Sequence, residues 1–133
     1  MIVVDASAIV DVILARPSAV TLLDRLFMRD RQIVVAAPDF IDAEVVASLR
    51  RSWFRKLVDE KQVAEALVYF DFLPIERRPS RGLALRVWEL RHNVKPYDAA
   101  YVALAELLDA PLITRDKRLA NSSGHRARIE YIA

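Results

Sequence analysis

Hydrophobic positions along the chain alternate between short continuous runs and longer stretches with helical spacing. The short apolar runs predict a buried strand at 1–4 and further strands at 33–37, 72–75 and 112–114, and the segment 129–132 is a candidate fifth strand. The stretches with helical spacing predict helices over 6–15, 18–29, 39–57, 59–71, 82–92 and 97–108. Strands that alternate with helices are typical of an α/β fold, here a three-layer α/β/α sandwich with a central, mostly parallel sheet.

Polar residues and prolines predict where these helices begin and end. Ser18, Asp39 and Asp59 are expected to cap helices, and Pro96 suits a first helical residue. The helical stripes expected to face the core are Val20, Leu22, Leu23, Leu26 and Phe27; Ile41, Val45, Val46, Leu49, Trp53 and Leu57; and Val63, Leu67 and Phe70. The segment 77–81 reads as a basic turn, and Trp53, Trp88, Phe70 and Phe72 are expected in the core or an interface.

Four acids fall where one edge of the predicted sheet should lie. Asp5 follows the first strand, and Asp116 follows the strand 112–114 by two residues. Asp98 lies in the first turn of the helix after Pro96, and Glu44 lies in the second turn of the helix after 33–37. Because ligands of parallel α/β sheets bind beyond the carboxyl ends of the strands, these four side chains are expected to converge.

Converging carboxylates predict a metal site. Several carboxylates at close range repel one another, and a divalent cation relieves that repulsion. An all-oxygen donor set suits Mg²⁺ or Mn²⁺ better than Zn²⁺. Such an ion activates water for hydrolysis of a phosphodiester. The chain outside the four acids has an excess of basic residues, which suits a polyanionic substrate.

Each of these residues also has a structural interpretation. Asp5 and Asp116 suit helix caps, and Asp98 suits the positive end of a helix dipole. Glu44 lies past the capping positions, and is the hardest of the four to explain structurally. Hydroxyls near strand ends, such as Ser7 and Thr114, often bond to the backbone. The functional interpretation therefore rests on the set of residues.

Composition narrows the classes of chemistry. The 133 residues fit one domain, 1–133, and the absence of Cys excludes disulfides, thiolate zinc sites and a cysteine nucleophile. Two Gly are too few for a dinucleotide or P-loop phosphate cradle, and two His cannot form a His-rich metal site. No apolar run is long enough to span a membrane and no secretory leader is visible, so a soluble cytoplasmic protein is expected.

The net charge is +2, and most of the basic residues are Arg. Arg suits bidentate phosphate contacts, so nucleic acid is a permitted partner. Arg50, Arg51, Arg55 and Lys56 are expected to form a solvated helix face. Arg115, Lys117 and Arg118 flank Asp116 and are expected at the rim of the acidic site. The apolar fraction of 54% slightly exceeds the usual range and hints at a protein partner.

Four segments carry a family resemblance. They are Ile2-Val3-Val4-Asp5-Ala6-Ser7-Ala8, Pro38-Asp39-Phe40-Ile41-Asp42-Ala43-Glu44, Tyr97-Asp98-Ala99-Ala100-Tyr101-Val102-Ala103-Leu104-Ala105, and Thr114-Arg115-Asp116-Lys117-Arg118-Leu119. In this order and at this spacing, the chain resembles PIN-domain ribonucleases, and among them the VapC-type toxins of toxin–antitoxin pairs.

The resemblance implies an Mg²⁺- or Mn²⁺-dependent endoribonuclease that leaves a 5′-phosphate. Positions matching Asp5 and Asp98 are the usual metal ligands in the family, and those matching Glu44 and Asp116 complete the acidic set directly or through water. Ser7 and Thr114 match hydroxyl positions that steady the site. The family also implies a homodimer and a small antitoxin that inserts a segment, often with Arg, into the acidic groove. Asn121 stands where some relatives carry a further acid, which leaves the number of metal ions, one or two, open.

Two other functions remain as alternatives. Haloacid-dehalogenase-type phosphohydrolases also carry Asp after a first strand, but they need a second Asp where this chain has Ser7. A catalytically degenerate PIN scaffold would bind RNA or a protein partner without cleaving. The complete acidic set disfavours that alternative, and neither the RNA substrate nor the cleavage site can be derived from the sequence.

Overall fold

The computed structural model describes residues 1–132, with the side chain of Ser18 outside the described part. One sheet contains the five described strands, in the order β3-β2-β1-β4-β5. Their bounds are β1 Ile2–Val4, β2 Val35–Pro38, β3 Ile75–Arg78, β4 Leu112–Thr114 and β5 Ile129–Tyr131. All four pairings are parallel, in agreement with the predicted fold class.

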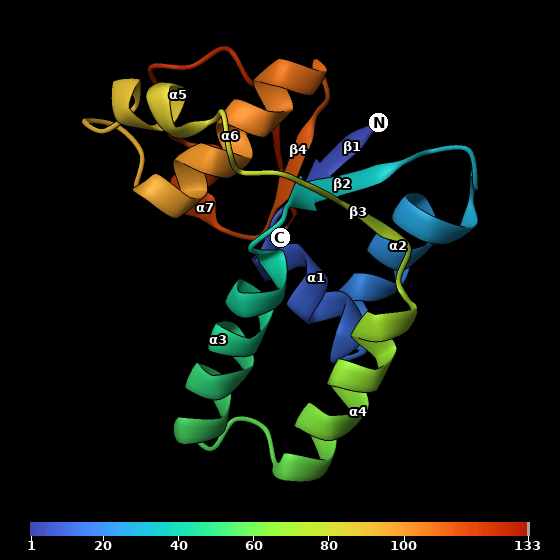
Figure 1. Cartoon of the computed structure of the whole chain (residues 1–133). Helices are drawn as coiled ribbons and strands as arrows, with labels where there is room; N and C mark the ends of the chain where they lie inside the picture. The colour runs from blue at the N-terminus through green and yellow to red at the C-terminus, as the bar shows by residue number, and fades with distance from the viewer. Residues whose placement is uncertain (133) are drawn as a thin grey trace.

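Helices cover both faces of this sheet (Figure 1). Their bounds are α1 Ala6–Ile13, α2 Val20–Leu23, α3 Ile41–Phe54, α4 Glu60–Phe72, α5 Ala84–Glu89, α6 Pro96–Leu108 and α7 Lys117–Ala120. Helix α6 packs against β1, β2 and β4, with α5 beside it, whereas α1 contacts β4 and packs against α3 and α4. The arrangement is the predicted three-layer sandwich.

The central strands explain why the sheet forms here. Every residue of β1 and of β4 is buried, which is typical of parallel strands covered on both faces. Helix α6 begins with Pro96, as predicted, and is buried continuously from Ala99 to Ala105. This core holds the carboxyl ends of β1 and β4 side by side, because Val4 pairs with Ile113.

The third predicted strand is displaced in the structure. Segment 72–75 was expected to be a strand, but Phe72 ends α4 with 82% of its surface exposed. The strand begins at Ile75 and includes Arg77 and Arg78, which were expected in a turn. Strand β3 is at the edge of the sheet, where charged side chains are tolerated. Arg77 there forms a bidentate ion pair with Asp42, at 2.7 and 2.8 Å.

Helix ends were predicted with mixed success. Asp59 caps α4 in a capping box with Gln62, as expected: each backbone N–H donates to the other side chain. Asp39 does not cap α3, which follows Phe40; the Asp39 carboxylate instead accepts the Ser80 backbone N–H at 3.2 Å. The predicted cap at Ser18 lies outside the described side chains. Segment 18–29 is not one helix but a 3₁₀ turn, a short α-helix and a π-helical turn, Asp24–Met28.

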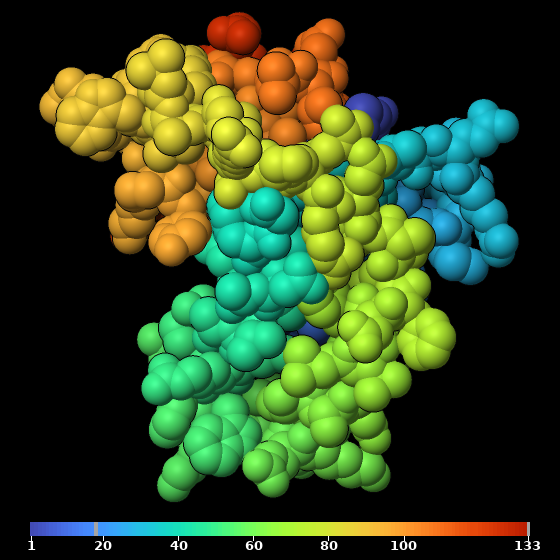
Figure 2. Space-filling model, in the orientation of Figure 1, coloured from blue at the N-terminus to red at the C-terminus, as the bar shows by residue number. Residues whose placement is uncertain are grey.

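The apolar stripes are only partly buried. Ile41, Val45 and Leu49 are buried in the core, whereas Val46, Trp53 and Leu57 are exposed, as is Val20. Of the aromatic residues expected in the core or an interface, Phe70 is buried and Trp88 is exposed. For Val46, Trp53 and Leu57 the reason is that α3 and α4 extend beyond the sheet as a hairpin, which forms a separate lobe in Figure 2. Residues in the outer turns have no third element to cover them.

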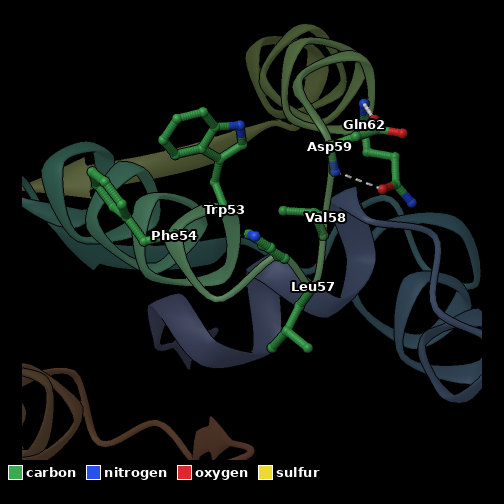
Figure 3. A pocket seen from close by; sticks show the side chains of 7 residues that line it. Trp53, Phe54, Leu57, Val58, Asp59 and Gln62 are labelled. Carbon is green, nitrogen blue, oxygen red and sulfur yellow. Dashed lines mark hydrogen bonds between the residues drawn. The ribbon is translucent and has the colours of Figure 1, made fainter.

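The tip of this hairpin carries an apolar pocket of about 620 Å³. Figure 3 shows Trp53, Phe54 and Leu57 projecting around it, next to the hydrogen-bonded pair Asp59 and Gln62. The lining contains one carboxylate, Asp59, which is already engaged as a helix cap. This pocket therefore offers apolar contact area rather than catalytic groups.

Candidate active site

The four acids singled out in the sequence line one pocket at the carboxyl edge of the sheet. We call this the acid pocket; its volume is about 170 Å³ and its lining is Asp5, Ala6, Ser7, Glu44, Ala47, Ser48, Arg51, Asp98, Tyr101 and Asp116. Strand β1 ends directly before Asp5, and β4 ends two residues before Asp116. Glu44 comes from the N-terminal half of α3 and Asp98 from the first turn of α6. Elements far apart in the sequence thus contribute one acid each.

Asp5 is the most firmly held of these acids. Its side chain is buried, and its Oδ1 accepts the Ser7 hydroxyl at 2.6 Å and the Ala8 backbone N–H at 3.1 Å. Its Oδ2 accepts the Thr114 hydroxyl. The bond to Ala8 is the helix cap of the structural interpretation. Asp5 therefore caps α1 and lines the acid pocket at once.

Two hydroxyls join Asp5 to the segment that follows β4. The Thr114 Oγ1 donates to Asp5 and accepts the Asp116 backbone N–H at 2.9 Å. In the same way, the Ser7 Oγ donates to Asp5 and accepts the Arg115 backbone N–H at 2.9 Å. Asp116 in turn caps α7 by accepting the Arg118 and Leu119 backbone N–H groups. The hydroxyls therefore fix the position of Asp116 relative to Asp5.

These hydrogen bonds predict that substitution of Thr114 lowers the stability of the fold. Thr114→Val keeps the volume of the side chain but removes one donor from buried Asp5 and the acceptor of the Asp116 N–H. We expect the free energy of unfolding to fall by about 1–3 kcal/mol, the cost of unsatisfied buried polar groups. Urea denaturation measures it, with Thr21→Val, at an exposed position of α2, as the matched control. Equal stability of the two variants would contradict a stabilising role for the Thr114 hydrogen bonds.

Mutual repulsion and burial shape the proton affinities of the pocket. Burial raises the pKa of Asp98 to about 6, and the charges of Asp116, Asp5 and Glu44 act in the same direction. Burial also raises the pKa of Glu44, and again the Asp5 charge adds to it. The pKa of Asp5 is raised by burial despite its three hydrogen bonds. A positive charge nearby would stabilise the ionised form of all three carboxylates and so lower their pKa values.

Two residues of the pocket were missed by sequence reasoning. Tyr101 is buried, and within residues 1–132 its hydroxyl has no hydrogen-bond partner of normal geometry, although it lies close enough to Glu44 for each to influence the pKa of the other. Arg51 was expected on a solvated helix face, yet it lines the pocket. Both carry a helical signal: Tyr101 is three residues after Asp98, and Arg51 is seven after Glu44.

The donor chemistry of the acid pocket fits a hard divalent cation. All candidate ligand atoms are oxygens, and the carboxylates raise one another's pKa by repulsion. Within residues 1–132, no three acidic or imidazole side chains converge tightly enough to enclose an ion. Mg²⁺ does not require such an enclosure, since it commonly binds through one or two carboxylates and retains several waters.

Arg115 has a different place from the one expected. It was predicted at the rim of the acidic site, but its guanidinium forms an ion pair with buried Asp11 of α1 at 2.7 Å. Arg16 contacts the same carboxylate. The buried charge on Asp11 explains this arrangement, because an unpaired buried carboxylate is strongly unfavourable. Arg115 thus fastens the segment after β4 to α1.

The chain is similar to known proteins over its whole length. The family model of the PIN domain matches residues 2–124. The chain is 41% identical over 133 residues to Ribonuclease VapC12 of Mycobacterium tuberculosis, with 100% of both proteins covered. It is 40% identical over 131 residues to Ribonuclease VapC1 of the same organism, which covers 98% of this chain and 96% of the relative.

A solved structure resembles the fold. The crystal structure of VapBC2 from Rickettsia felis, bound to a DNA fragment from its promoter, superposes with a TM-score of 0.67 over 100% of both chains. The sequence identity is 18%, so this likeness concerns the fold alone. Among the described residues, no helix is both long and apolar enough to cross a membrane.

Proposed function

The chain belongs to the PIN domain family, and we propose that it is an Mg²⁺- or Mn²⁺-dependent endoribonuclease, the toxin of a type II toxin–antitoxin pair. The observation that carries this proposal is the gathering of Asp5, Glu44, Asp98 and Asp116 around one pocket at the carboxyl edge of the sheet. The full-length similarity to proteins named ribonucleases supports RNA as the substrate. We take residues 1–133 as a single catalytic domain.

The proposed chemistry is hydrolysis of a phosphodiester. Asp5 and Asp98 would hold the cation, and Glu44 and Asp116 would complete its surroundings directly or through water. When bound, the cation supplies Lewis acidity to the phosphate and lowers the pKa of water. The Glu44 carboxylate, whose pKa burial raises, accepts a proton from the attacking water as the new P–O bond forms. The P–O bond to the 3′-oxygen breaks, the 5′-phosphate stays on the other fragment, and the 3′-oxygen takes up a proton from solvent. The Arg51 guanidinium, on the same helix, offsets negative charge on the phosphate.

The other site residues act on position rather than on the substrate. The Ser7 and Thr114 hydroxyls hold both oxygens of Asp5, so its orientation is set before substrate binds. The backbone bonds to Ser7 and Thr114 set the position of Asp116. Such preorganisation lowers the reorganisation needed at the moment of reaction.

RNA cleavage with and without free metal tests this proposal. We expect the purified protein to fragment bulk cellular RNA in Mg²⁺ or Mn²⁺, to stop when EDTA is added, and to resume when the metal is restored in excess. Binding of RNA without cleavage under every metal condition would contradict a nuclease. That outcome would favour the degenerate PIN scaffold instead.

A protein partner is also proposed. A small antitoxin would insert an Arg-bearing segment into the acid pocket, where four carboxylates attract it. The full-length similarity to ribonucleases named VapC, together with a fold neighbour that is named as a VapBC2 assembly, supports an antitoxin partner. Exposed Trp53, Phe54 and Leu57 add apolar surface that suits protein contact. A homodimer and a cytoplasmic location, both expected from the sequence, stay predictions.

A further inference from the structure

A second hollow adjoins the acid pocket. We call it the basic hollow; its volume is about 260 Å³ and its lining is Asn93, Val94, Lys95, Asp98, Asp116, Lys117, Arg118, Leu119 and Ser122. Asp98 and Asp116 line both spaces. The two hollows therefore adjoin, with these two carboxylates between them.

The charge of the basic hollow is opposite to that of its neighbour. Apart from the two shared acids, its charged residues are Lys95, Lys117 and Arg118, all exposed. Within the described part of the chain, none of these three cations forms an ion pair, whereas nearby Arg126 and Arg128 do. Lys95 lies close enough to Asp98 to lower its pKa, against the stronger effects that raise it. The hollow thus keeps three cations available to an anion.

The walls of the basic hollow are held in place. Asp116 caps α7, and so fixes the helix that carries Lys117 and Arg118. The Asn93 side-chain amide donates to the Ser123 carbonyl at 3.0 Å. The next residue, Gly124, has a φ of 86°, and a Cβ there would come within 2.2 Å of the Asn93 Nδ2. This close approach joins the segment before α6 to the segment after α7, so the hollow has a defined shape.

From this arrangement we propose that the basic hollow binds the phosphate next to the scissile one on a single-stranded RNA substrate. The inference rests on the proposed nuclease function and assigns the path of the strand: one phosphate faces the carboxylates and its neighbour faces Lys95, Lys117 and Arg118. Four acids alone would repel a polyanion. Cations beside them attract the strand without entering the reaction.

The double variant Lys117→Gln/Arg118→Gln tests this path. We expect cleavage of bulk RNA to fall about tenfold at low RNA concentration and to recover at saturating RNA, because binding rather than chemistry is weakened. A fluorescein-labelled, random-sequence single-stranded RNA 12-mer in EDTA gives a second readout. In a plot of log affinity against log salt concentration, the slope for the double variant should be shallower than that of the wild type by about 1.4, which is about 0.7 for each lost phosphate contact. The conservative variant Lys117→Arg should bind as the wild type does.

The matched control is Arg55→Gln/Lys61→Gln, which removes the same charge from exposed positions of the α3–α4 hairpin. Equal effects of the two double variants would overturn the basic hollow as a specific site, and so would an unchanged salt slope. The two proposals fail separately. If the wild type cleaves RNA and Lys117→Gln/Arg118→Gln binds RNA normally, only this inference is refuted. If the wild type never cleaves RNA and the double variant still has a reduced salt slope, only the nuclease function is refuted.

Discussion

Asp98→Asn should reduce RNA cleavage by at least about 10³-fold, since a metal contributes several kcal/mol of transition-state stabilisation and each 1.36 kcal/mol is tenfold in rate. The substitution keeps the shape of the side chain but removes the charge that attracts the cation. Asp98 contributes from the first turn of α6, whose buried face is unaffected by the change. Initial rates on bulk RNA in excess Mn²⁺ measure the effect.

The same variant should be more stable than the wild type when no metal is bound. Burial and three neighbouring acids raise the pKa of Asp98 to about 6, so its charge is unfavourable in the folded protein at neutral pH. After allowance for solvent screening, removal of that charge should stabilise the fold by on the order of 1 kcal/mol. Thermal unfolding in EDTA at pH 7.5 should therefore show a higher Tm for Asp98→Asn.

The dependence of the stability on pH has a definite sign. Folded Asp98 binds its proton more tightly than the unfolded chain does, because its pKa is raised from 3.8 to about 6. The stabilisation by that proton is complete below about pH 4 and is lost as the pH rises to about 6. The Tm advantage of Asp98→Asn over the wild type should grow across this window.

Asp109→Asn is the control for both measurements. Asp109 ends the same helix in a left-handed conformation that Asn tolerates, and its side chain is 90% exposed. We expect cleavage and Tm close to those of the wild type. Full activity of Asp98→Asn, or a Tm in EDTA below that of Asp109→Asn, would contradict the role given to Asp98.

Mg²⁺ or Mn²⁺ should raise the Tm of the wild-type protein at pH 7.5. A ligand that binds only the folded state stabilises it by about 2.7 kcal/mol at 100 times its dissociation constant. The physical source is relief of the repulsion among Asp5, Asp98 and their acidic neighbours. Differential scanning calorimetry across a metal titration gives the shift and the affinity together.

Two comparisons make this measurement specific. The metal-induced shift should shrink at pH 5, where protons compete for the raised-pKa carboxyl of Asp98. It should nearly vanish in Asp98→Asn and persist in Asp109→Asn. A shift of equal size in both variants would place the cation elsewhere on the protein.

The sequence by itself determined the sandwich and the family. Apolar runs located β1, β2 and β4 to within about two residues, because buried parallel strands are apolar throughout. Strand β5 was also located, although it lies at the edge of the sheet and carries Glu130. The resemblance to PIN-domain ribonucleases is confirmed by the family model over residues 2–124. Asp59 and Pro96 marked helix starts correctly, since capping and a fixed proline φ act locally.

Tertiary contacts decided what those local patterns could not. The position of β3 depended on pairing with β2, which accommodates Arg77 and Arg78 at the edge of the sheet and leaves Phe72 in a helix. Trp53 and Leu57 continue an apolar helical stripe, yet they are exposed because the α3–α4 hairpin extends past the sheet. Periodicity shows which face of a helix is apolar; it does not show where the neighbouring element ends.

The site shows the same division. Order along the chain identified Asp5, Glu44, Asp98 and Asp116 as acids at strand or helix ends, and the fold brought them to one pocket. The fold also pairs Arg115 with buried Asp11 and places Arg51 and Tyr101 beside the acids. Sequence specifies the chemistry of each side chain and its local backbone, but partners across the sheet are chosen by long-range packing, which no single segment contains.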